Sequence, residues 1–335
     1  MVMSPLIDRY NRVIRYIRIS ITDRCNLRCI YCMPQEGVPL LKHENILSFE
    51  EIGRIARAFV HLGVSSIRIT GGEPLLRRDI IHLINKLSNI KGISDLSITT
   101  NATLLSEYAE PLKMAGLNRV NTSLDSLYPK RFFEITRGGN LKDVLDGIDS
   151  ALKAGLKPVK INMVVMRGIN DNEVIEMARY FMGRPVNLRF IECMPTNRKS
   201  FLPARHFIPM EEVEKKIRRE FPLEQTLVKG VGPAHYYRIK GDLLRLGFIS
   251  PISQHFCGNC NKVRLTADGR LRLCLLQEDK EFYLGEALQK GVSDRILTRM
   301  IKKVIMAKPS GHKLVAGNME SCKYEFKGSM SSIGG

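Results

Sequence analysis

The sequence predicts an α/β protein, with an incomplete (βα)6 TIM-like barrel followed by a smaller C-terminal α+β region. Three observations predict this fold. Six short β-branched runs alternate with helical segments between about residues 16 and 193, and a second region with shorter elements begins near residue 225. In addition, the polar residues of the six runs share one face. A doubly wound open sheet is the alternative architecture.

Each of the six runs is a predicted strand that leads into a helix, so we expect parallel strands with right-handed crossovers. The first helical segment, 49–62, carries Ile52, Ile55 and Phe59 at helical spacing. Gly63 follows this segment and is typical of a helix C-cap. The predicted strands are 16–21, 66–70, 95–99, 119–124, 158–165 and 186–193.

Side chains alternate between the two faces of a strand, and this alternation predicts a polar inner face. A closed eight-stranded barrel fills its interior with Val, Ile and Leu, and burying four unpaired cations there would be costly. Any one of these cations could form a structural ion pair with Asp23, Asp125 or Glu192. Such pairs explain the presence of all four cations on one face poorly. We therefore expect the inner face to meet water and an anionic ligand. Its four cations are Arg18, Arg68, Lys160 and Arg189.

The pattern of elements changes after residue 193. Pro195, Pro203 and Pro209 interrupt a loop, and a charged helix is predicted at 210–221. We therefore expect a barrel over residues 1–224 and a second region over residues 225–335, which ends in a Gly-Gly tail. The elements predicted in the second region are strands at 236–239, 243–248, 262–266 and 271–274 and a helix at 294–306.

The composition excludes several classes of protein. The charge is 52 − 34 = +18 and the hydrophobic content is 44%, which fits a globular chain with a large core. No apolar run reaches the ~20 residues of a membrane span. Pro5, Asp8 and Arg9 interrupt the N-terminal segment, which therefore lacks the apolar stretch of a secretory signal. The lack of Trp argues against a nucleic-acid partner. We expect a cytoplasmic protein without membrane contact.

A first cysteine triplet follows the first predicted strand. Cys25, Cys29 and Cys32 have the spacing C-x3-C-x2-C. Three thiolates this close can bind three irons of a [4Fe–4S] cluster and leave the fourth iron open to a small molecule. A zinc site is the alternative, although zinc prefers C-x2-C pairs and four ligands. Cys193 and Cys322 stand alone and are interpreted as ordinary thiols.

A second triplet lies in the C-terminal region, at Cys257, Cys260 and Cys274. With His255 or His312 as fourth ligand, these cysteines could hold a structural zinc ion. Beside the first triplet, a second iron–sulfur cluster with an open iron is the favoured interpretation.

The first triplet, with Tyr31 before its last cysteine, resembles the radical S-adenosylmethionine (SAM) superfamily, whose fold is a partial (βα)6 barrel. Gly71-Gly72-Glu73-Pro74 is similar to the GGE segment that contacts SAM in that superfamily. Nearly the whole chain resembles the GTP 3′,8-cyclase family of molybdenum cofactor biosynthesis. The segments that carry this resemblance are Ile-Ser-Ile-Thr-Asp-Arg-Cys at 19–25, Ile-Arg-Ile-Thr-Gly-Gly-Glu-Pro-Leu at 67–75, Asn-Thr-Ser-Leu-Asp at 121–125, Arg-Phe-Ile-Glu at 189–192 and Arg-Leu-Thr-Ala-Asp-Gly at 264–269.

The resemblance implies a role for each matching residue. The first triplet would hold the cluster that binds SAM, and the second triplet would hold a cluster that binds guanine. The implied SAM contacts are Tyr31, Gly72, Ser123 and Met194. The expected GTP contacts are Arg18, Arg68, Thr99, Lys160, Arg189, Lys262 and Arg264. Arg264 is also the candidate catalytic residue, as a hydrogen-bond or proton partner late in the reaction.

The implied activity is the cyclisation of GTP to (8S)-3′,8-cyclo-7,8-dihydroguanosine 5′-triphosphate, the first step of molybdenum cofactor biosynthesis. In the family, an electron from the first cluster cleaves SAM to a 5′-deoxyadenosyl radical. This radical removes hydrogen from the ribose, and the sugar radical attacks C8 of guanine. The resemblance also implies a homodimer, a flavodoxin or ferredoxin as reductant, and contact with the next enzyme of the pathway.

Two residues depart from the family pattern. Lys262 stands where relatives often carry Arg, which keeps the charge but loses the bidentate fork, and Ser66 stands where they often carry a basic residue. Two other functions stay open at this stage. One is a radical SAM enzyme that acts on a peptide or RNA, and the other is a zinc protein that binds nucleic acid. Iron and sulfide analysis separates the zinc protein from the enzymes.

Overall fold

The structure is a computed structural model, and it describes residues 5–194, 204–226, 232–276, 282–315 and 333. Strands and helices alternate through the first part of the chain, as predicted. The strands are β1 (Tyr16–Ser20), β2 (Ser66–Thr70), β3 (Asp95–Thr100), β4 (Arg119–Ser123), β5 (Val159–Val165) and β6 (Val186–Glu192). The helices are α1 (Phe49–His61), α2 (Ile80–Ser88), α3 (Leu105–Met114), α4 (Pro129–Thr136), α5 (Leu141–Lys153) and α6 (Val174–Phe181).

The C-terminal elements are shorter and mix strands with helices. The predicted helices at 210–221 and 294–306 are confirmed to within one residue. Three elements of this part were not predicted, namely β7, β12 and α8. The observed elements are α7 (Met210–Glu220), β7 (Leu223–Gln225), β8 (His235–Ile239), β9 (Arg245–Ile249), β10 (Lys262–Leu265), β11 (Arg270–Arg272), β12 (Phe282–Tyr283), α8 (Leu284–Gln289) and α9 (Asp294–Ile305).

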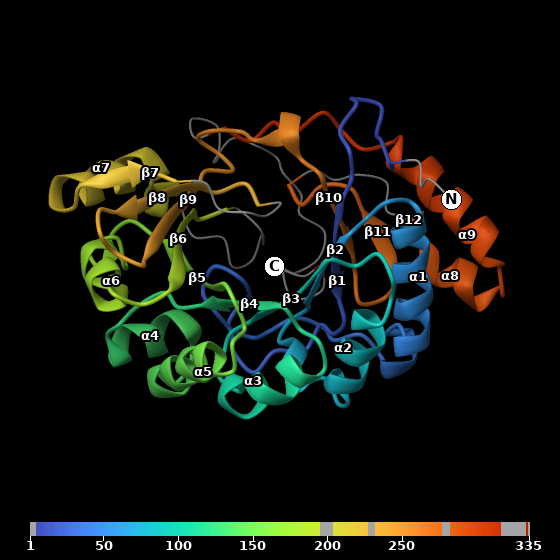
Figure 1. Cartoon of the computed structure of the whole chain (residues 1–335), viewed down its shortest axis with the longest axis horizontal. Coiled ribbons are helices and arrows are strands. Elements are labelled where there is room, and N and C mark those ends of the chain that lie inside the picture. Colours follow the sequence, from blue (N-terminus) through green and yellow to red (C-terminus); the bar gives the residue numbers. More distant parts are fainter. Residues whose placement is uncertain (1–4, 195–203, 227–231, 277–281, 316–332, 334–335) are drawn as a thin grey trace.

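All of these strands join one sheet, in the order β12-β11-β10-β1-β2-β3-β4-β5-β6-β9-β8-β7. Strands β1 to β6 are parallel to their neighbours, and β10 and β9 extend the parallel part beyond β1 and β6. The sheet curves around a central space and the helices cover its outer side (Figure 1). The incomplete barrel is therefore confirmed, and the doubly wound alternative is wrong because the helices lie on one side.

The two predicted regions share this sheet. The predicted boundary after residue 224 falls inside β7, and the C-terminal strands β9 and β10 pair with β6 and β1. Pairing between strands so far apart in the sequence leaves no periodicity for a sequence analysis to detect. The division into two regions stays a prediction, and the Gly-Gly tail lies outside the described residues.

Local sequence explains how the outer layer forms. Helix α1 begins at a capping box, in which the Ser48 hydroxyl accepts from the Glu51 N–H at 3.2 Å and the Glu51 carboxylate accepts from the Ser48 N–H at 2.7 Å. Gly63 ends the helix with a φ of 87°, as its predicted C-cap role requires. The apolar residues of each strand, such as Ile17 and Ile67, are buried beneath the helices.

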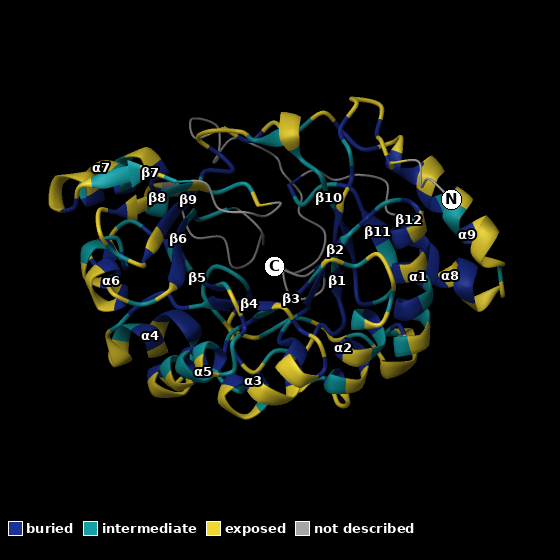
Figure 2. Ribbon diagram, viewed as in Figure 1, coloured by how far each residue is buried: buried dark blue, intermediate teal, exposed yellow. Residues whose placement is uncertain are grey.

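Burial follows the layers of the fold. Strands β1 to β6 are mostly buried, whereas many exposed residues lie on the outer sides of the helices (Figure 2). Because the apolar half of each strand faces the helices, the other half faces the central space. No helix within the described residues has both the length and the apolar character that crossing a bilayer requires.

Candidate functional site

The inner face of the sheet borders a cavity of about 330 Å³. Both cysteine triplets line it, although more than 220 residues separate them in the sequence. The expected SAM contacts Tyr31, Gly72, Ser123 and Met194 also line this cavity. Of the expected GTP contacts, the cavity lining includes Arg18, Arg68, Thr99, Arg189, Lys262 and Arg264, whereas Lys160 is absent from it.

The first triplet is held by a loop that packs on the end of α4. The loop donates two backbone hydrogen bonds to α4, from Arg28 to the Thr136 oxygen at 3.0 Å and from Ile30 to the Ile135 oxygen at 2.9 Å. Inside the loop, the Cys32 N–H donates to the Cys29 oxygen at 2.9 Å. These bonds turn the three thiols toward the same cavity.

The three cysteines of the first triplet are half-buried, and their thiols lie close enough for their charges to interact. Burial raises the pKa of Cys25 to about 11, and burial followed by the charge of Cys25 raises the pKa of Cys32 to about 12. Burial, and then the charges of Cys32 and Asp125, raises the pKa of Cys29 as well. Three thiolates would therefore repel one another strongly unless a metal centre neutralised them, so this donor set fits a metal cluster.

Gly71 and Gly72 bring the end of β2 against the start of this loop. The Gly72 N–H donates to the Thr22 oxygen at 2.8 Å, and the Glu73 N–H donates to the Arg24 oxygen at 2.7 Å. A Cβ at Gly72 would lie only 2.2 Å from the Arg24 oxygen, so another residue would push the chains apart. Gly72 is therefore required for the close approach of two backbones beside Cys25.

Glu73 bridges two strand ends rather than facing the cavity. Its carboxylate accepts from the Thr100 hydroxyl at 2.8 Å and from the backbone N–H groups of Asn101 and Leu75 at 2.7 and 3.0 Å. Burial raises its pKa to about 7, against the effect of these hydrogen bonds. Its position makes Glu73 a brace between β2 and β3.

The second triplet comes from a short turn and the end of β11. Cys257 is the first residue of one turn of 3-10 helix (Cys257–Asn259) and Cys260 follows that turn, where its N–H donates to the Cys257 oxygen at 3.1 Å. Burial would raise the pKa of Cys260, but the charges of Lys308 and Lys262 and a backbone hydrogen bond lower it below its usual value. This site is therefore more electropositive than the first and also suits thiolate ligands.

Two histidines lie beside this triplet. The Cys257 sulfur and the ring nitrogens of His255 and His312 lie within 4.8 Å of one another. The alternative of a histidine as fourth ligand to zinc is therefore available in the geometry. Metal analysis decides between zinc and iron.

The inner wall of the sheet carries a row of cations. The register places Arg18 between Arg68 and Arg264, with Lys262 beside Tyr16. Arg68 is 7% exposed and its guanidinium carbon lies 5.3 Å from the centre of the Tyr16 ring. Burial would raise the pKa of Tyr16, but the charges of Arg68, Arg18 and Arg119 lower it. The wall is thus strongly electropositive.

Several buried polar atoms of this wall have no hydrogen-bond partner among the described residues. They are Arg68 Nε, Thr99 Oγ1, Asn162 Oδ1 and Arg189 Nε. Each of these residues lines the cavity. A buried polar group without a partner is costly, so the wall fits a polar, anionic ligand.

The acids that could have neutralised this wall have other partners. Within the described residues, Asp23, Asp125 and Glu192 form no ion pair with Arg18, Arg68, Lys160 or Arg189. They accept instead from the backbone N–H groups of Leu41 at 2.5 Å, Val164 at 2.8 Å and Ile252 at 2.8 Å, respectively. Structural ion pairs therefore do not explain the four predicted cations.

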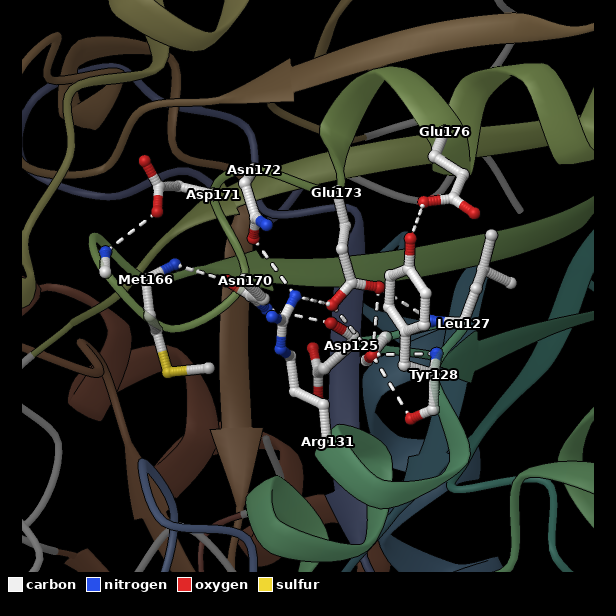
Figure 3. A network of polar contacts seen from close by, with 12 residues as sticks. Asp125, Leu127, Tyr128, Arg131, Met166, Asn170, Asp171, Asn172, Glu173 and Glu176 are labelled. Atoms are coloured by element: carbon white, nitrogen blue, oxygen red, sulfur yellow. Dashed lines mark hydrogen bonds and ion pairs between the residues drawn. The ribbon is translucent and has the colours of Figure 1, made fainter.

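Asp125 also fixes Tyr31, because the Tyr31 hydroxyl donates to its carboxylate at 2.7 Å. Asn170 holds the same turn by donating to the Asp125 backbone oxygen at 2.8 Å. Figure 3 shows the network behind this turn, in which Glu173 binds Arg131 and the N–H of Leu127. The turn after β4 is therefore a rigid support for Tyr31.

Arg119 and Tyr16 also belong to this wall, although neither was predicted as a site residue. Arg119 lies on the inner parity of β4 and binds Asp95 through two bonds of 2.6 and 2.7 Å. Strand alternation alone could have found both residues. Lys160 sits on the same side, where burial and then the charges of Arg119 and Arg189 lower its pKa to about 6. Of the two single cysteines, Cys193 lines the cavity, and Cys322 lies outside the described residues.

Comparison with protein families agrees with this geometry. The model of the radical SAM superfamily matches residues 19–181, and the model named Molybdenum Cofactor Synthesis C matches residues 186–314. Among solved structures, Streptococcus suis SuiB bound to S-adenosylmethionine superposes with a TM-score of 0.62 at 15% identity. That match covers 91% of this chain and 74% of SuiB. The fold and the site define a radical SAM enzyme.

The chain belongs to the GTP 3′,8-cyclase family. The GTP 3′,8-cyclase of Desulforamulus reducens is 47% identical over 332 residues, which is 98% of this chain and 100% of the relative. That of Thermodesulfovibrio yellowstonii is 48% identical over 306 residues, 91% of this chain and 94% of the relative. Membership confirms the expected family and its cofactors, [4Fe–4S] clusters and SAM.

We expect Cys274→Ala to remove one cluster and leave the other in place. Because three cysteines are the minimum set for a cubane with an open iron, the variant should hold about half the iron and sulfide of the native protein. Cys193→Ala is the matched control, since Cys193 lines the same cavity without belonging to a triplet. Iron and sulfide analysis after anaerobic purification measures both. Full iron content in Cys274→Ala would contradict the assignment.

Proposed function

We propose that this enzyme cyclises GTP to (8S)-3′,8-cyclo-7,8-dihydroguanosine 5′-triphosphate, the first step of molybdenum cofactor biosynthesis. The observation that carries the proposal is the common cavity. Two thiol triplets line it, and Arg68 and Arg189 in its wall have no carboxylate partner among the described residues. A nucleoside triphosphate supplies the negative charge that this wall lacks. The relatives named GTP 3′,8-cyclase support the same reaction.

The two triplets divide the cofactors between them. Cys25, Cys29 and Cys32 would hold the cluster that binds SAM, and the second triplet would hold the cluster that faces the guanine. When bound, the first cluster and SAM supply the reducing electron and the radical. The protein would limit the access of water to this chemistry by holding both triplets in one cavity.

We propose that SAM lies along the carboxyl ends of β2, β4 and β6, where its four expected contacts line the cavity. Gly72 leaves backbone space there, since a side chain at this position would strike the Arg24 oxygen. Asp125 fixes the Tyr31 hydroxyl, which also contacts Cys29 of the first triplet. These residues would orient SAM toward the open iron of the first cluster.

The triphosphate would lie against Arg18, Arg68, Arg189 and Lys262. Charge-assisted hydrogen bonds to phosphate are the strongest that such a site can form, and Arg68 and Arg189 each have a buried Nε to offer. Lys262 offers no fork for two oxygens. Burial, and then the charge of Arg18, lowers its pKa to about 7, and a bound triphosphate would favour its charged form. Thr99 has a buried hydroxyl without a partner among the described residues and would bind the sugar or a phosphate.

We also propose a cytoplasmic homodimer that takes electrons from a flavodoxin or ferredoxin and passes its product to the next enzyme of the pathway. These proposals come from the family resemblance. The net charge of +18 supports an acidic protein as reductant, because electrostatic steering accelerates such encounters.

The deciding experiment is anaerobic incubation of the reconstituted enzyme with SAM, GTP and dithionite. Mass analysis should find 5′-deoxyadenosine and a cyclised nucleotide in equal amounts. A reaction with ATP in place of GTP is the control and should yield no cyclised product. Formation of 5′-deoxyadenosine without any change in GTP would refute the proposed substrate.

Arg68→Ala should raise the KM for GTP about 10- to 100-fold. A hydrogen bond to a charged group is worth about 1.5–3 kcal/mol. Arg68 has no carboxylate partner among the described residues, so the substitution removes the contact with GTP without breaking an ion pair of the protein. Arg78→Ala is the matched control, because the Arg78 side chain is exposed. Initial rates at varied GTP measure the effect. An unchanged KM would remove Arg68 from the triphosphate site.

Arg264→Ala should lower kcat more than it raises KM. Burial, and then the charge of Arg18, lowers the pKa of Arg264 to about 9, which brings it closer to the range of a useful proton partner. The loss of such a partner costs about 100-fold or more. Arg264→Lys should recover part of the rate. Normal GTP binding together with normal turnover in Arg264→Ala would exclude the catalytic role.

GTP binding should take up protons at about pH 7.5. The pKa of Lys160 is about 6 in the free protein, so its amine is mainly neutral there. Lys160 does not line the cavity, but the charges of Arg68 and Arg189 act on it, so a triphosphate bound to these arginines would raise its pKa. Binding would then draw a proton from the buffer. Calorimetry in phosphate and in Tris buffers measures the uptake. The uptake should fall in Lys160→Met, and an equal uptake in this variant would contradict the assignment to Lys160.

A further inference from the structure

The second triplet is supported from behind by a segment that follows α9. Residues 308–312 run against Cys257, where a Cβ at Gly311 would lie 2.8 Å from the Cys257 Cβ and 3.1 Å from its sulfur. Only a glycine allows the backbone this close. The segment therefore forms part of the immediate surroundings of the second triplet, although it carries no cysteine.

Lys308 in this segment joins the two chain segments that hold the other two cysteines. Its ammonium donates to the Lys262 oxygen at 2.9 Å and to the Leu273 oxygen. Lys262 lies two residues after Cys260, and Leu273 directly precedes Cys274. One buried side chain thus fixes the spacing of two of the three thiols.

Lys308 is 2% exposed, and no described carboxylate pairs with it. Its hydrogen bonds end on neutral carbonyl oxygens, so they satisfy its donors but do not neutralise its charge. An ammonium buried in this way is costly unless a negative group lies near it. The charge of Lys308 already acts on the Cys260 thiol, whose pKa it lowers.

Arg12 contacts the backbone of the third cysteine, Cys257, but its positive charge is neutralised by Asp8. It is 7% exposed, and its guanidinium donates to the Cys257 oxygen at 2.8 Å, to the Ser310 oxygen at 2.9 Å and to the Pro309 oxygen. Its Nε donates to Asp8 at 2.6 Å, and this buried pair is neutral overall. Of Arg12 and Lys308, therefore, Lys308 is the cation without a described carboxylate partner, and its charge adds to that of Lys262 near Cys260.

We propose that Lys308 is a positioning residue that acts as the counter-charge of the second cluster and raises its reduction potential. The proposal rests on the proposed function, which assigns a cluster to Cys257, Cys260 and Cys274. A cubane held by three thiolates is negatively charged, and one-electron reduction adds a further negative charge. A fixed ammonium beside it stabilises the reduced form more than the oxidised form.

The test separates the charge of Lys308 from its hydrogen bonds. Lys308→Gln keeps amide donors for both carbonyl oxygens and removes the charge, whereas Lys308→Arg keeps the charge. Both are made in full-length protein carrying Cys25→Ala, Cys29→Ala and Cys32→Ala, so that the second cluster is observed alone. Lys303→Gln is the matched control, because it removes the same charge from the exposed last turn of α9.

The measurement is a redox titration with dithionite, followed by electron paramagnetic resonance. Lys308→Gln should become harder to reduce by at least tenfold, which is about 59 mV toward lower potential for one electron. Lys308→Arg and Lys303→Gln should stay close to the parent. A parent potential in Lys308→Gln with a full cluster would overturn the proposal and leave the proposed function intact.

A variant that loses its cluster also gives an answer. If circular dichroism shows folded Lys308→Gln without iron while Lys308→Arg holds iron and sulfide, the charge is needed to retain the cluster and the proposal stands. If both variants are folded and lack iron, side-chain geometry is the cause and the proposal is wrong. If the parent itself holds no iron or sulfide, the proposed function and this inference fail together.

Discussion

The site depends on a group of like charges that the parallel sheet forces together. Register sets Arg18 beside both Arg68 and Arg264, and alternation turns all three inward. Burial and the neighbouring charges lower the pKa of Arg68 and of Arg264. This arrangement costs folding energy that the apolar outer layer must offset. An anionic ligand relieves this repulsion. The buried cations that destabilise the protein without a ligand therefore also give it affinity for an anion.

The carboxylates near the cavity have a different task. Glu73, Asp125 and Glu192 lie at the carboxyl ends of β2, β4 and β6, and each accepts hydrogen bonds from backbone N–H groups. Glu73 braces β2 against β3, Asp125 fixes Tyr31, and Glu192 binds the segment at Ile252 that leads to Cys257. Had these acids paired with the arginines, the wall would carry less positive charge and these contacts would be lost. The separation of acids from cations therefore gives the enzyme both a rigid rim and a charged wall.

The sequence was informative wherever a local pattern decided the structure. Strand alternation predicted the inner cations, and cysteine spacing predicted both triplets. Pairing of β10 with β1 depends on contacts between residues about 245 positions apart, which no local pattern records. For the same reason the sequence could not show that Gly247 lies opposite Arg189 and leaves room for its side chain. The depth of Lys160 was equally hidden, because it depends on the curvature of the whole sheet.

The two triplets differ in what holds them, and this difference follows from their place in the chain. The first lies in one loop that α4 supports over a short distance. The second is complete only when Arg12, the turn at Cys257 and the segment from Lys308 meet, and these lie far apart in the sequence. Its geometry thus depends on closure of the whole barrel edge around β1 and β10. A metal centre built this way is sensitive to distant changes, whereas the first centre is governed mainly by its own loop.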